Sequence, residues 1–383
     1  MYKNIKNQFP ILKKITYFDS AALVLKPKSA INAINNFYLN ASISSRTADT
    51  PLGNLVNQTI AELRQKVAKL IKAEAHNVIF TSGTTESINN MALMMEQVIK
   101  KNDIILLSAY NHSSNMLPWI EMAKKVGATI IVSENIEEDI NQNVKLISLS
   151  QETNNFNEKL NLKNIYKKAN LNGTIIVNDA AQAIAHQEVS FDNCDVIAFS
   201  ANKFYGPTGL GVLAIKDRVL KKIRPSKFGG GSVAKIDKNN NWTLKETIAA
   251  FEPGTPDLAG MFMFNKAIDF FNTIGYKKTK VILKKLSIYL HTRLSSLSNV
   301  EVFTQPGDII CLINVKNVNA QDVATYLGDR NIYTIAGIFC APYLRNIKPN
   351  SSYLRISLGI YNDFSDIDKL TYELENGGMF LEI

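Results

Sequence analysis

The sequence predicts an α/β protein, with a large domain built on a mostly parallel sheet and a smaller α+β domain in its C-terminal third. Two observations lead to this prediction. Between residues 77 and 216, short apolar runs of strand length alternate with longer segments whose apolar residues recur at helical spacing. That alternation is typical of parallel sheets covered by helices on both faces. After about residue 260 it gives way to long helical segments and isolated strands.

The elements of the large domain follow from apolar periodicity. We expect strands at residues 77–82, 103–108, 129–133, 144–150, 174–179, 196–200 and 211–215. Apolar residues three and four apart predict helices at residues 84–100, 114–127 and 160–172. The second of these helices ends on Gly127, a common stop signal. The sequence contains no internal repeat and no low-complexity segment.

The last third of the chain has a different pattern. We expect one or two long helices at 261–297, strands at 301–316, a helix at 320–331, a strand at 353–359 and a helix at 364–377. The predicted domains are therefore a large domain over residues 16–260 and a small domain over residues 261–383, which residues 1–15 join. No linker rich in Pro, Gly or Ser marks the boundary.

Composition narrows the classes of function. The chain of 383 residues is 46% hydrophobic and 20% charged, which is ordinary for a globular protein. Its net charge of +9 comes with lysines scattered along the chain. A nucleic-acid-binding surface requires clustered basic residues, so we expect no nucleic-acid partner. An anionic substrate or cofactor is compatible with this charge.

Cysteine usage and hydropathy indicate the compartment. The three cysteines, Cys194, Cys311 and Cys340, are too few and too scattered for a disulfide framework, and none lies in a CxxC pair that would suggest zinc. No stretch of about 18 uncharged apolar residues predicts a membrane span. We therefore expect a soluble cytoplasmic protein without a bound metal.

Polar residues follow five of the predicted strands. In open α/β sheets, ligands bind in the crevice outside the carboxyl ends of the strands. The polar stretches at these ends are 81–85, 108–112, 150–151, 179–182 and 200–203. We expect them to line one crevice.

Residues 81–86 read Thr-Ser-Gly-Thr-Thr-Glu and lie where a strand passes into a helix. Free backbone N–H groups at a helix N-terminus, together with hydroxyl groups, favour binding of a phosphate. The same letters also suit helix capping, because Glu86 stands three residues after Gly83. Both interpretations stay open at this point.

Three further residues carry candidate chemistry. Asp179 ends an apolar strand, where a buried carboxylate requires a cationic partner or acts as a helix cap. Lys203 stands at the end of a later strand, where desolvation would make its amine nucleophilic, although most lysines are solvated surface residues. His112 either stacks on a flat ring or is an ordinary loop histidine. A phosphate site, a carboxylate and a reactive amine together fit pyridoxal 5′-phosphate (PLP).

The chain resembles the class V enzymes of PLP fold type I, and most closely the cysteine desulfurases of the SufS/NifS type. The segments that carry the resemblance are YFDSAALVLKP (17–27), FTSGTTESIN (80–89), NHSSNMLPW (111–119), DAAQ (179–182), FSANKFYGPTGLGVL (199–213), GGG (229–231), FEPGTPD (251–257) and YLRISLGIYN (353–362). They extend over most of the chain. The resemblance implies the PLP-dependent transferase fold of type I.

For the cofactor, the resemblance implies that Lys203 binds PLP covalently and later moves the substrate Cα proton. Asp179 would pair with the pyridinium nitrogen, and His112 would stack on the ring. Gln182 would contact the ring hydroxyl. Gln151, where the family usually has asparagine, would lie beside it.

The resemblance also implies how the phosphate is bound. Thr84, Thr85 and Ser200 would hold it within one subunit. Asn202 stands where the family usually has a phosphate-binding histidine, and its amide can still donate a hydrogen bond. Thr255 would reach the phosphate of the partner subunit, which implies a homodimer.

For the substrate, the resemblance implies that Arg355 binds the carboxylate of L-cysteine, a bidentate task that suits a guanidinium group. Cys340 stands at the position of the family's nucleophile, whose thiolate attacks the substrate sulfur to leave alanine and a persulfide. A lone cysteine between Phe339 and Ala341 is also consistent with a small buried side chain.

The sequence departs from the family near the proposed substrate and thiol. The family usually has arginine at the position of Ile335 and histidine directly before the cysteine, where this chain has Phe339. Asp49 stands where a histidine is usual and is a candidate substrate contact. The loss of both basic groups, together with apolar neighbours, disfavours a thiolate at Cys340.

We therefore expect a PLP-dependent cysteine desulfurase that supplies sulfur for Fe–S cluster assembly or tRNA thiolation, and that delivers it to a sulfur-acceptor scaffold protein. The first alternative is another class V activity, such as an aminotransferase, a selenocysteine lyase or an amino-acid lyase. The second is a PLP-fold protein that has lost its chemistry. The presence of Lys203, Asp179 and Arg355 disfavours the second alternative.

Overall fold

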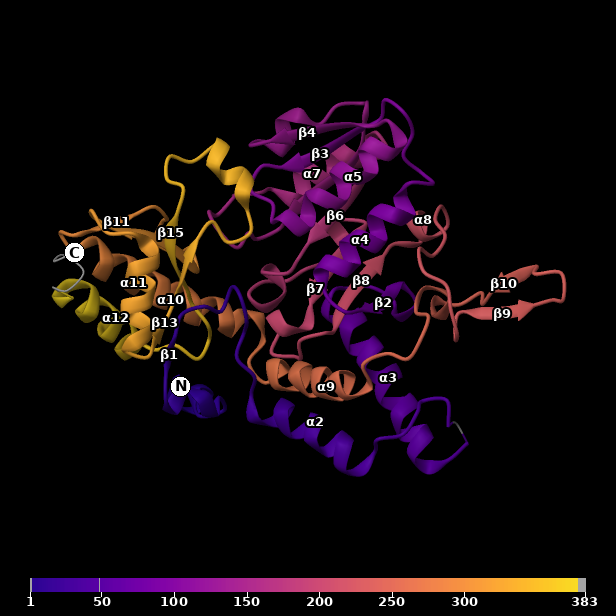
Figure 1. The fold of residues 1–383 in the computed structure, drawn as a ribbon, viewed down its shortest axis with the longest axis horizontal. Helices are drawn as coiled ribbons and strands as arrows, with labels where there is room; N and C mark the ends of the chain where they lie inside the picture. The colour runs from indigo at the N-terminus through magenta and orange to yellow at the C-terminus, as the bar shows by residue number, and fades with distance from the viewer. Residues whose placement is uncertain (1, 48, 378–383) are drawn as a thin grey trace.

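The computed structural model describes residues 2–47 and 49–377. Figure 1 shows two parts side by side: a large sheet with helices packed around it, and a smaller sheet from the C-terminal third. The N-terminal segment lies beside the C-terminal part, where β1 (Thr16–Tyr17) pairs in parallel with β13 (Ile332–Tyr333). Among the described residues, no helix combines the length and apolar character that crossing a membrane requires.

The large sheet has seven strands in the order β2-β8-β7-β6-β5-β3-β4. Their bounds are β2 Val78–Thr81, β3 Ile104–Ser108, β4 Thr129–Ser133, β5 Val144–Ser150, β6 Ile175–Asp179, β7 Val196–Ser200 and β8 Gly211–Ile215. β8 runs antiparallel to both of its neighbours, and the other pairs are parallel. The predicted mostly parallel sheet is confirmed.

Both faces of this sheet are buried, as its apolar strands predict. Ile176 and Ile197 belong to one apolar core, whereas their neighbours Val177 and Ala198 belong to the core on the opposite face. The helices that connect or directly follow these strands are α4 (Thr84–Met95), α5 (Leu117–Val126), α6 (Ile136–Asp139), α7 (Leu162–Leu171) and α8 (Asp217–Leu220). Because successive side chains of a strand point to opposite faces, an unbroken apolar run is what a doubly covered strand requires.

Three long helices lie below the large sheet in Figure 1: α2 (Lys28–Asn40), α3 (Pro51–Leu70) and α9 (Leu258–Asn272). α9 packs against both of the others. The predicted boundary between residues 260 and 261 therefore falls inside α9, and the division into domains stays a prediction. The β9–β10 hairpin (Val233–Ile236 and Trp242–Leu244) projects from the same part of the molecule.

The small sheet is antiparallel, in the order β11-β12-β15-β14. Its strands are β11 Val300–Val302, β12 Ile310–Val315, β14 Ile335–Gly337 and β15 Tyr353–Ser357. The remaining helices are α1 Tyr2–Lys6, α10 Gly275–Ser295, α11 Ala320–Asp329 and α12 Phe364–Asn376. The region expected to form one or two helices thus forms two, α9 and α10.

Candidate active site

The carboxyl ends of β5, β6 and β7 and the start of α4 meet at one cavity of about 100 Å³. The predicted site residues that line it are Thr84, Thr85, His112, Asp179, Gln182, Ser200 and Lys203. These residues come from four separate segments. The expectation that the polar strand ends share one crevice is therefore met for these residues.

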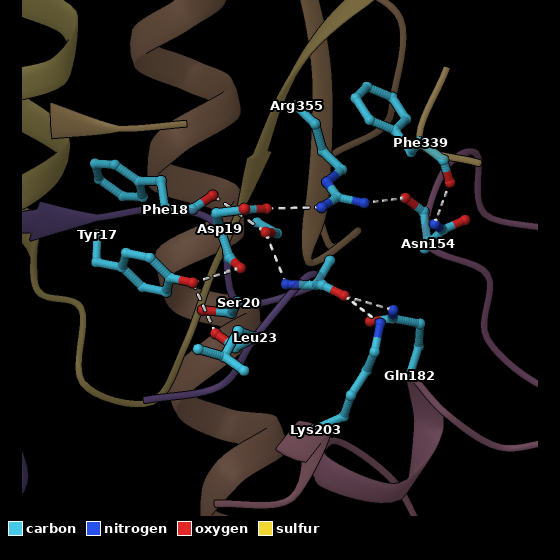
Figure 2. Close-up of polar contacts among 12 residues, drawn as sticks. Tyr17, Phe18, Asp19, Ser20, Leu23, Asn154, Gln182, Lys203, Phe339 and Arg355 are labelled. Carbon is cyan, nitrogen blue, oxygen red and sulfur yellow. Dashed lines mark hydrogen bonds and ion pairs between the residues drawn. The ribbon is translucent and has the colours of Figure 1, made fainter. Parts of the chain in front are cut away.

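Lys203 closes a short 3₁₀ turn, Ala201–Lys203, directly after β7. Its Nζ donates to the backbone carbonyl of Ala21 at 2.6 Å, and Gln182 Nε2 donates to the same carbonyl at 2.8 Å (Figure 2). Burial lowers the pKa of Lys203 to about 8, and the positive charge of Arg355 acts in the same direction. The uncharged, nucleophilic form of this amine is therefore far more populated at neutral pH than in an ordinary lysine.

Asp179 is the last residue of β6 and is 5% exposed. Its Oδ1 accepts the backbone N–H of Ala181 at 3.0 Å. Burial raises the pKa of Asp179 to about 6, although that hydrogen bond and the charge of Lys203 oppose the shift. A buried carboxyl at the edge of a cavity favours a ligand that presents a cationic N–H group.

His112 follows β3 and precedes a short 3₁₀ turn, Ser113–Asn115. Its Nδ1 accepts the backbone N–H of Ser114 at 3.1 Å. Burial, then the positive charges of Lys203 and Arg355, lower the pKa of His112 to about 4. The ring is therefore neutral at pH 7, with its proton on Nε2.

The anion end of the cavity lies at the start of α4. The backbone N–H of Thr84 donates to Ser200 Oγ at 2.7 Å, and the hydroxyl groups of these two residues lie 2.8 Å apart. The hydroxyl of Thr85 lies 2.9 Å from that of Ser114. Gly83, the N-cap residue of α4, has no side chain to cap the helix, and Glu86 instead accepts the backbone N–H of Ser82 just before the helix. Hydroxyl groups and helix N–H groups thus surround one end of the cavity.

Arg355 lies on β15 of the small sheet and is 2% exposed. Its two terminal nitrogens donate to Asp19 Oδ1 at 2.7 Å and to the backbone carbonyl of Asn154 at 3.0 Å (Figure 2). Its guanidinium carbon lies 4.7 Å from the centre of the Phe339 ring. Each terminal nitrogen carries two N–H groups, so each keeps a second one for another acceptor.

Cys340 is exposed and has a left-handed backbone conformation, with φ of 56°. Its carbonyl accepts the backbone N–H of Ser113 at 2.8 Å and the hydroxyl of Ser113 at 2.7 Å. Negative charge on Cys340 raises the pKa of both Lys203 and Arg355, which places the thiol within electrostatic range of both. Two cationic side chains of the site thus interact electrostatically with Cys340.

Two predicted cofactor contacts do not line the cavity. The amide of Gln151 donates to the carbonyl of Glu188 at 2.9 Å and accepts from Asn178 at 2.9 Å. Asn202 contributes its backbone carbonyl to Lys26 at 2.7 Å. Neither residue lines the cavity in this subunit.

Thr255 and Asp49 are exposed and also lie outside the cavity. Thr255 lines a separate groove of about 260 Å³ together with Glu86 and Lys227. Asp49 has a left-handed backbone, with φ of 68°, and lies just before α3. A role of either residue at the cofactor would require a second subunit or a rearranged loop.

Four site residues were not assigned from the sequence. Ser114 and Glu152 line the cavity, and Asn154 lines it and also binds Arg355. Asp19 pairs with Arg355. Asp19 lies inside the YFDSAAL segment, and Asn154 follows β5 closely, so both were near signals that the sequence provided. Among the described residues, no group of three or more His, Cys, Asp or Glu side chains could hold a metal ion.

Comparisons with known proteins agree with this geometry. The model of the aminotransferase class-V family matches residues 16–370. A probable cysteine desulfurase of Ureaplasma parvum is 34% identical over 96% of this chain and 95% of its own. A cysteine desulfurase structure from Thermococcus onnurineus superposes with a TM-score of 0.92 at 26% identity, covering 100% of this chain and 98% of that one.

The chain belongs to the class V aminotransferase family, among its cysteine desulfurases. The predicted fold is confirmed with the family. A C-DES variant whose PLP cofactor is linked covalently to glycine shares the fold, with a TM-score of 0.84 at 19% identity over 97% of this chain and 99% of that one. The predicted alternative of another class V activity is not favoured by these relatives.

The cofactor of this desulfurase is PLP, and the cavity fits it. The hydroxyl groups of Thr84 and Ser200 meet at a helix start, where a phosphate is favoured. The buried Asp179 suits a protonated ring nitrogen, and the desolvated Lys203 suits an aldehyde. All four residues line the same cavity.

Gly83, just before α4, and Gly211, at the start of β8, lie in close contact beside the phosphate end of the cavity. A Cβ atom on Gly211 would lie 2.4 Å from Gly83 Cα, too close for the backbone to stay in place. We expect Gly211→Ala to weaken PLP binding about tenfold, the cost of overpacking by one methyl group. Absorbance titration of cofactor-free protein with PLP measures this affinity. Gly328→Ala, whose Cβ would meet no atom within 4 Å, is the control, and unchanged affinity in Gly211→Ala would contradict the steric argument.

The lowered pKa of Lys203 predicts how PLP uptake depends on pH. The uncharged amine attacks the aldehyde, so uptake by cofactor-free desulfurase should accelerate as pH rises and level off above about pH 9. Asp179, Asp19 and Cys340 face this amine and partly offset the effects of burial and of Arg355. The rate with Nα-acetyl-lysine under the same conditions corrects for titration of PLP itself. A midpoint near the ordinary lysine value of 10.5 would rule out desolvation.

Proposed function

We propose that this chain removes sulfur from L-cysteine to give L-alanine, with Cys340 as the first sulfur acceptor. The observation that carries the proposal is that Arg355 of β15 and Cys340, in the loop after β14, are both hydrogen-bonded to the rim of the cofactor cavity. Arg355 donates to the carbonyl of Asn154, which lines the cavity. The Cys340 carbonyl accepts from Ser113, whose two neighbours in the chain line the cavity. Arg355 can bind a carboxylate, Lys203 can move a proton, and Cys340 can accept sulfur.

Bound PLP supplies an electron sink for negative charge at the substrate Cα. Arg355 would bind the substrate carboxylate through the second N–H group on each of its terminal nitrogens. Lys203 would take the Cα proton, since its lowered pKa of about 8 lies close to neutral pH, where a general base is effective. Neutral His112 would support the ring without adding positive charge.

Cys340 would attack the substrate sulfur as a thiolate. The bond between Cβ and sulfur breaks, and an S–S bond forms on Cys340. A proton then completes the methyl group of alanine. Atoms balance, because the persulfide keeps the substrate sulfur while the substrate carbon skeleton gains one hydrogen. A thiol reductant releases the persulfide as sulfide and restores Cys340.

The remaining functional predictions concern partners. We propose a homodimer in which Thr255 of each subunit approaches the phosphate of the other, supported by its exposed position beside Glu86 at the start of α4. We also propose a sulfur-acceptor scaffold protein, for Fe–S cluster assembly or tRNA thiolation, supported by the exposure of Cys340. The free state of all three cysteines supports a cytoplasmic location.

The test is product analysis with L-cysteine, PLP and a thiol reductant. We expect sulfide and alanine in equal amounts. Without reductant, the peptide that contains Cys340 should gain the mass of one sulfur atom. Pyruvate and ammonia in place of alanine would identify a lyase. Bound PLP without any turnover of cysteine would point to another amino-acid substrate.

A further inference from the structure

The guanidinium carbon of Arg355 lies over the ring of Phe339, 4.7 Å from the ring centre, and Figure 2 shows the two side chains next to each other. Asp19 and the carbonyl of Asn154 fix the same group within its plane. Stacking on an aromatic face sets the plane of a guanidinium, and in-plane hydrogen bonds set its rotation. Together these contacts restrict how the guanidinium group can turn toward a carboxylate.

The backbone that carries Phe339 also carries Cys340, and both residues are left-handed, with φ of 55° and 56°. This conformation is costly for a bulky side chain, so other contacts must hold it. Asn154 Nδ2 donates to the Phe339 carbonyl at 2.7 Å. Ser113 donates twice to the Cys340 carbonyl. Asn154 thus contacts both Arg355 and the loop of the thiol.

Phe339 is 8% exposed and belongs to a small apolar cluster with Leu312 and Tyr353. Ile335 packs against this cluster from β14, where it is the strand partner of Arg355. The two positions at which this chain lacks the basic residues usual in the family therefore lie together. In this chain both positions are apolar and lie next to Arg355, where the family usually has two further basic side chains.

We propose that Phe339 is a positioning residue that fixes the plane of Arg355 for the substrate carboxylate and, through the adjoining backbone, holds Cys340 beside it. This inference rests on the roles of Arg355 and Cys340 in the proposed function. The aromatic ring would position these groups by packing, whereas a basic side chain at this position would act through its charge.

The test measures amino-acid binding to PLP-loaded full-length protein by absorbance titration. The two ligands are L-alanine and ethylamine, which is alanine without its carboxylate. Phe339→Leu keeps an apolar side chain but removes the aromatic face. We expect its affinity for alanine to fall about fivefold, the order of one cation–π contact, while its affinity for ethylamine stays unchanged. Phe339→Met is used in the same way if the leucine variant does not fold.

Two variants separate this role from general packing. Phe339→Tyr keeps the ring and should bind alanine like the wild-type protein. Phe303→Leu removes another ring from the same cluster, one that packs on Tyr353 at 5.0 Å, and should also leave alanine binding unchanged. In sulfide release from cysteine, Phe339→Leu should raise KM and lower kcat, and Phe339→Tyr should restore both.

The outcomes distinguish this inference from the proposed function. If wild-type protein bound alanine no better than ethylamine, Arg355 would not bind the carboxylate, and both proposals would fail. If wild type favoured alanine and Phe339→Leu did so equally, the proposed function would stand and the role of Phe339 would be overturned. If Phe339→Leu bound alanine and ethylamine more weakly by the same factor, the ring would contribute only general packing, and its proposed role would likewise be overturned.

Discussion

Replacing Lys203 with alanine should abolish both the covalent retention of PLP and the release of sulfide. The loss of activity should reach about 10³-fold or more, because one side chain serves as nucleophile toward the cofactor and as the base at Cα. Absorbance after gel filtration reports retained cofactor, and sulfide release reports activity. Lys28→Ala is the matched control, since Lys28 is exposed at the start of α2, away from the cavity.

The electrostatics of the cavity offer a second measurement on the same variant. The charge of Lys203 lowers the pKa of His112 and also that of Asp179. Removal of this charge should therefore raise both pKa values, and NMR titration of His112 in the cofactor-free protein can follow the change. Unaltered titration of His112 would show that the charge of Lys203 does not act on this ring. Covalent cofactor in Lys203→Ala would show that another amine binds PLP.

The fold was predictable wherever burial imposes a clear apolar pattern. The strands at 129–133 and 144–150 appear with the predicted bounds, because a strand covered on both faces must be apolar throughout. The helix predicted over 84–100 instead ends at Met95. Ile99 is buried although it lies beyond the helix, so apolar spacing alone overestimated the helix length.

α2 and α3 were not predicted, for a physical reason. α2 is rich in asparagine, and only Ala30 and Phe37 are buried within it. Its place is set by packing against α9, more than 200 residues later in the chain. Local sequence carries little information about such a contact, because the stabilising surface belongs to a distant segment.

The candidate site, too, was predictable from the sequence only in part. The polar residues at the strand ends were sufficient to predict that Lys203, Asp179 and His112 share one cavity. It could not determine side-chain direction: Gln151 follows a strand end yet bonds to Asn178 on the neighbouring strand. Nor could spacing show that residues 19, 154 and 339 converge on Arg355, because three different loops bring them there.

Replacing Cys340 with alanine should abolish sulfide release while PLP binding stays intact. The thiol is exposed, so its loss removes no core packing, and the fold should be unaffected. We expect a decrease in sulfide release of at least about 10²-fold, since no other nucleophile takes over the transfer. Cys194→Ala, in the buried core of the large domain, controls for the general loss of a thiol.

Proton exchange separates the two largest effects. Lys203 would still remove the Cα proton of bound alanine in Cys340→Ala, so exchange of that proton in D₂O should continue at the wild-type rate. Lys203→Ala should lose exchange and sulfide release together. If Cys340→Ala released sulfide as fast as wild type, sulfur would leave the substrate without forming a persulfide on the enzyme. The apolar residues Ile335 and Phe339 would then be a sign of this change. Lys203 and Arg355 both interact electrostatically with Cys340, so the loss of the family's usual arginine and histidine does not itself argue for that outcome.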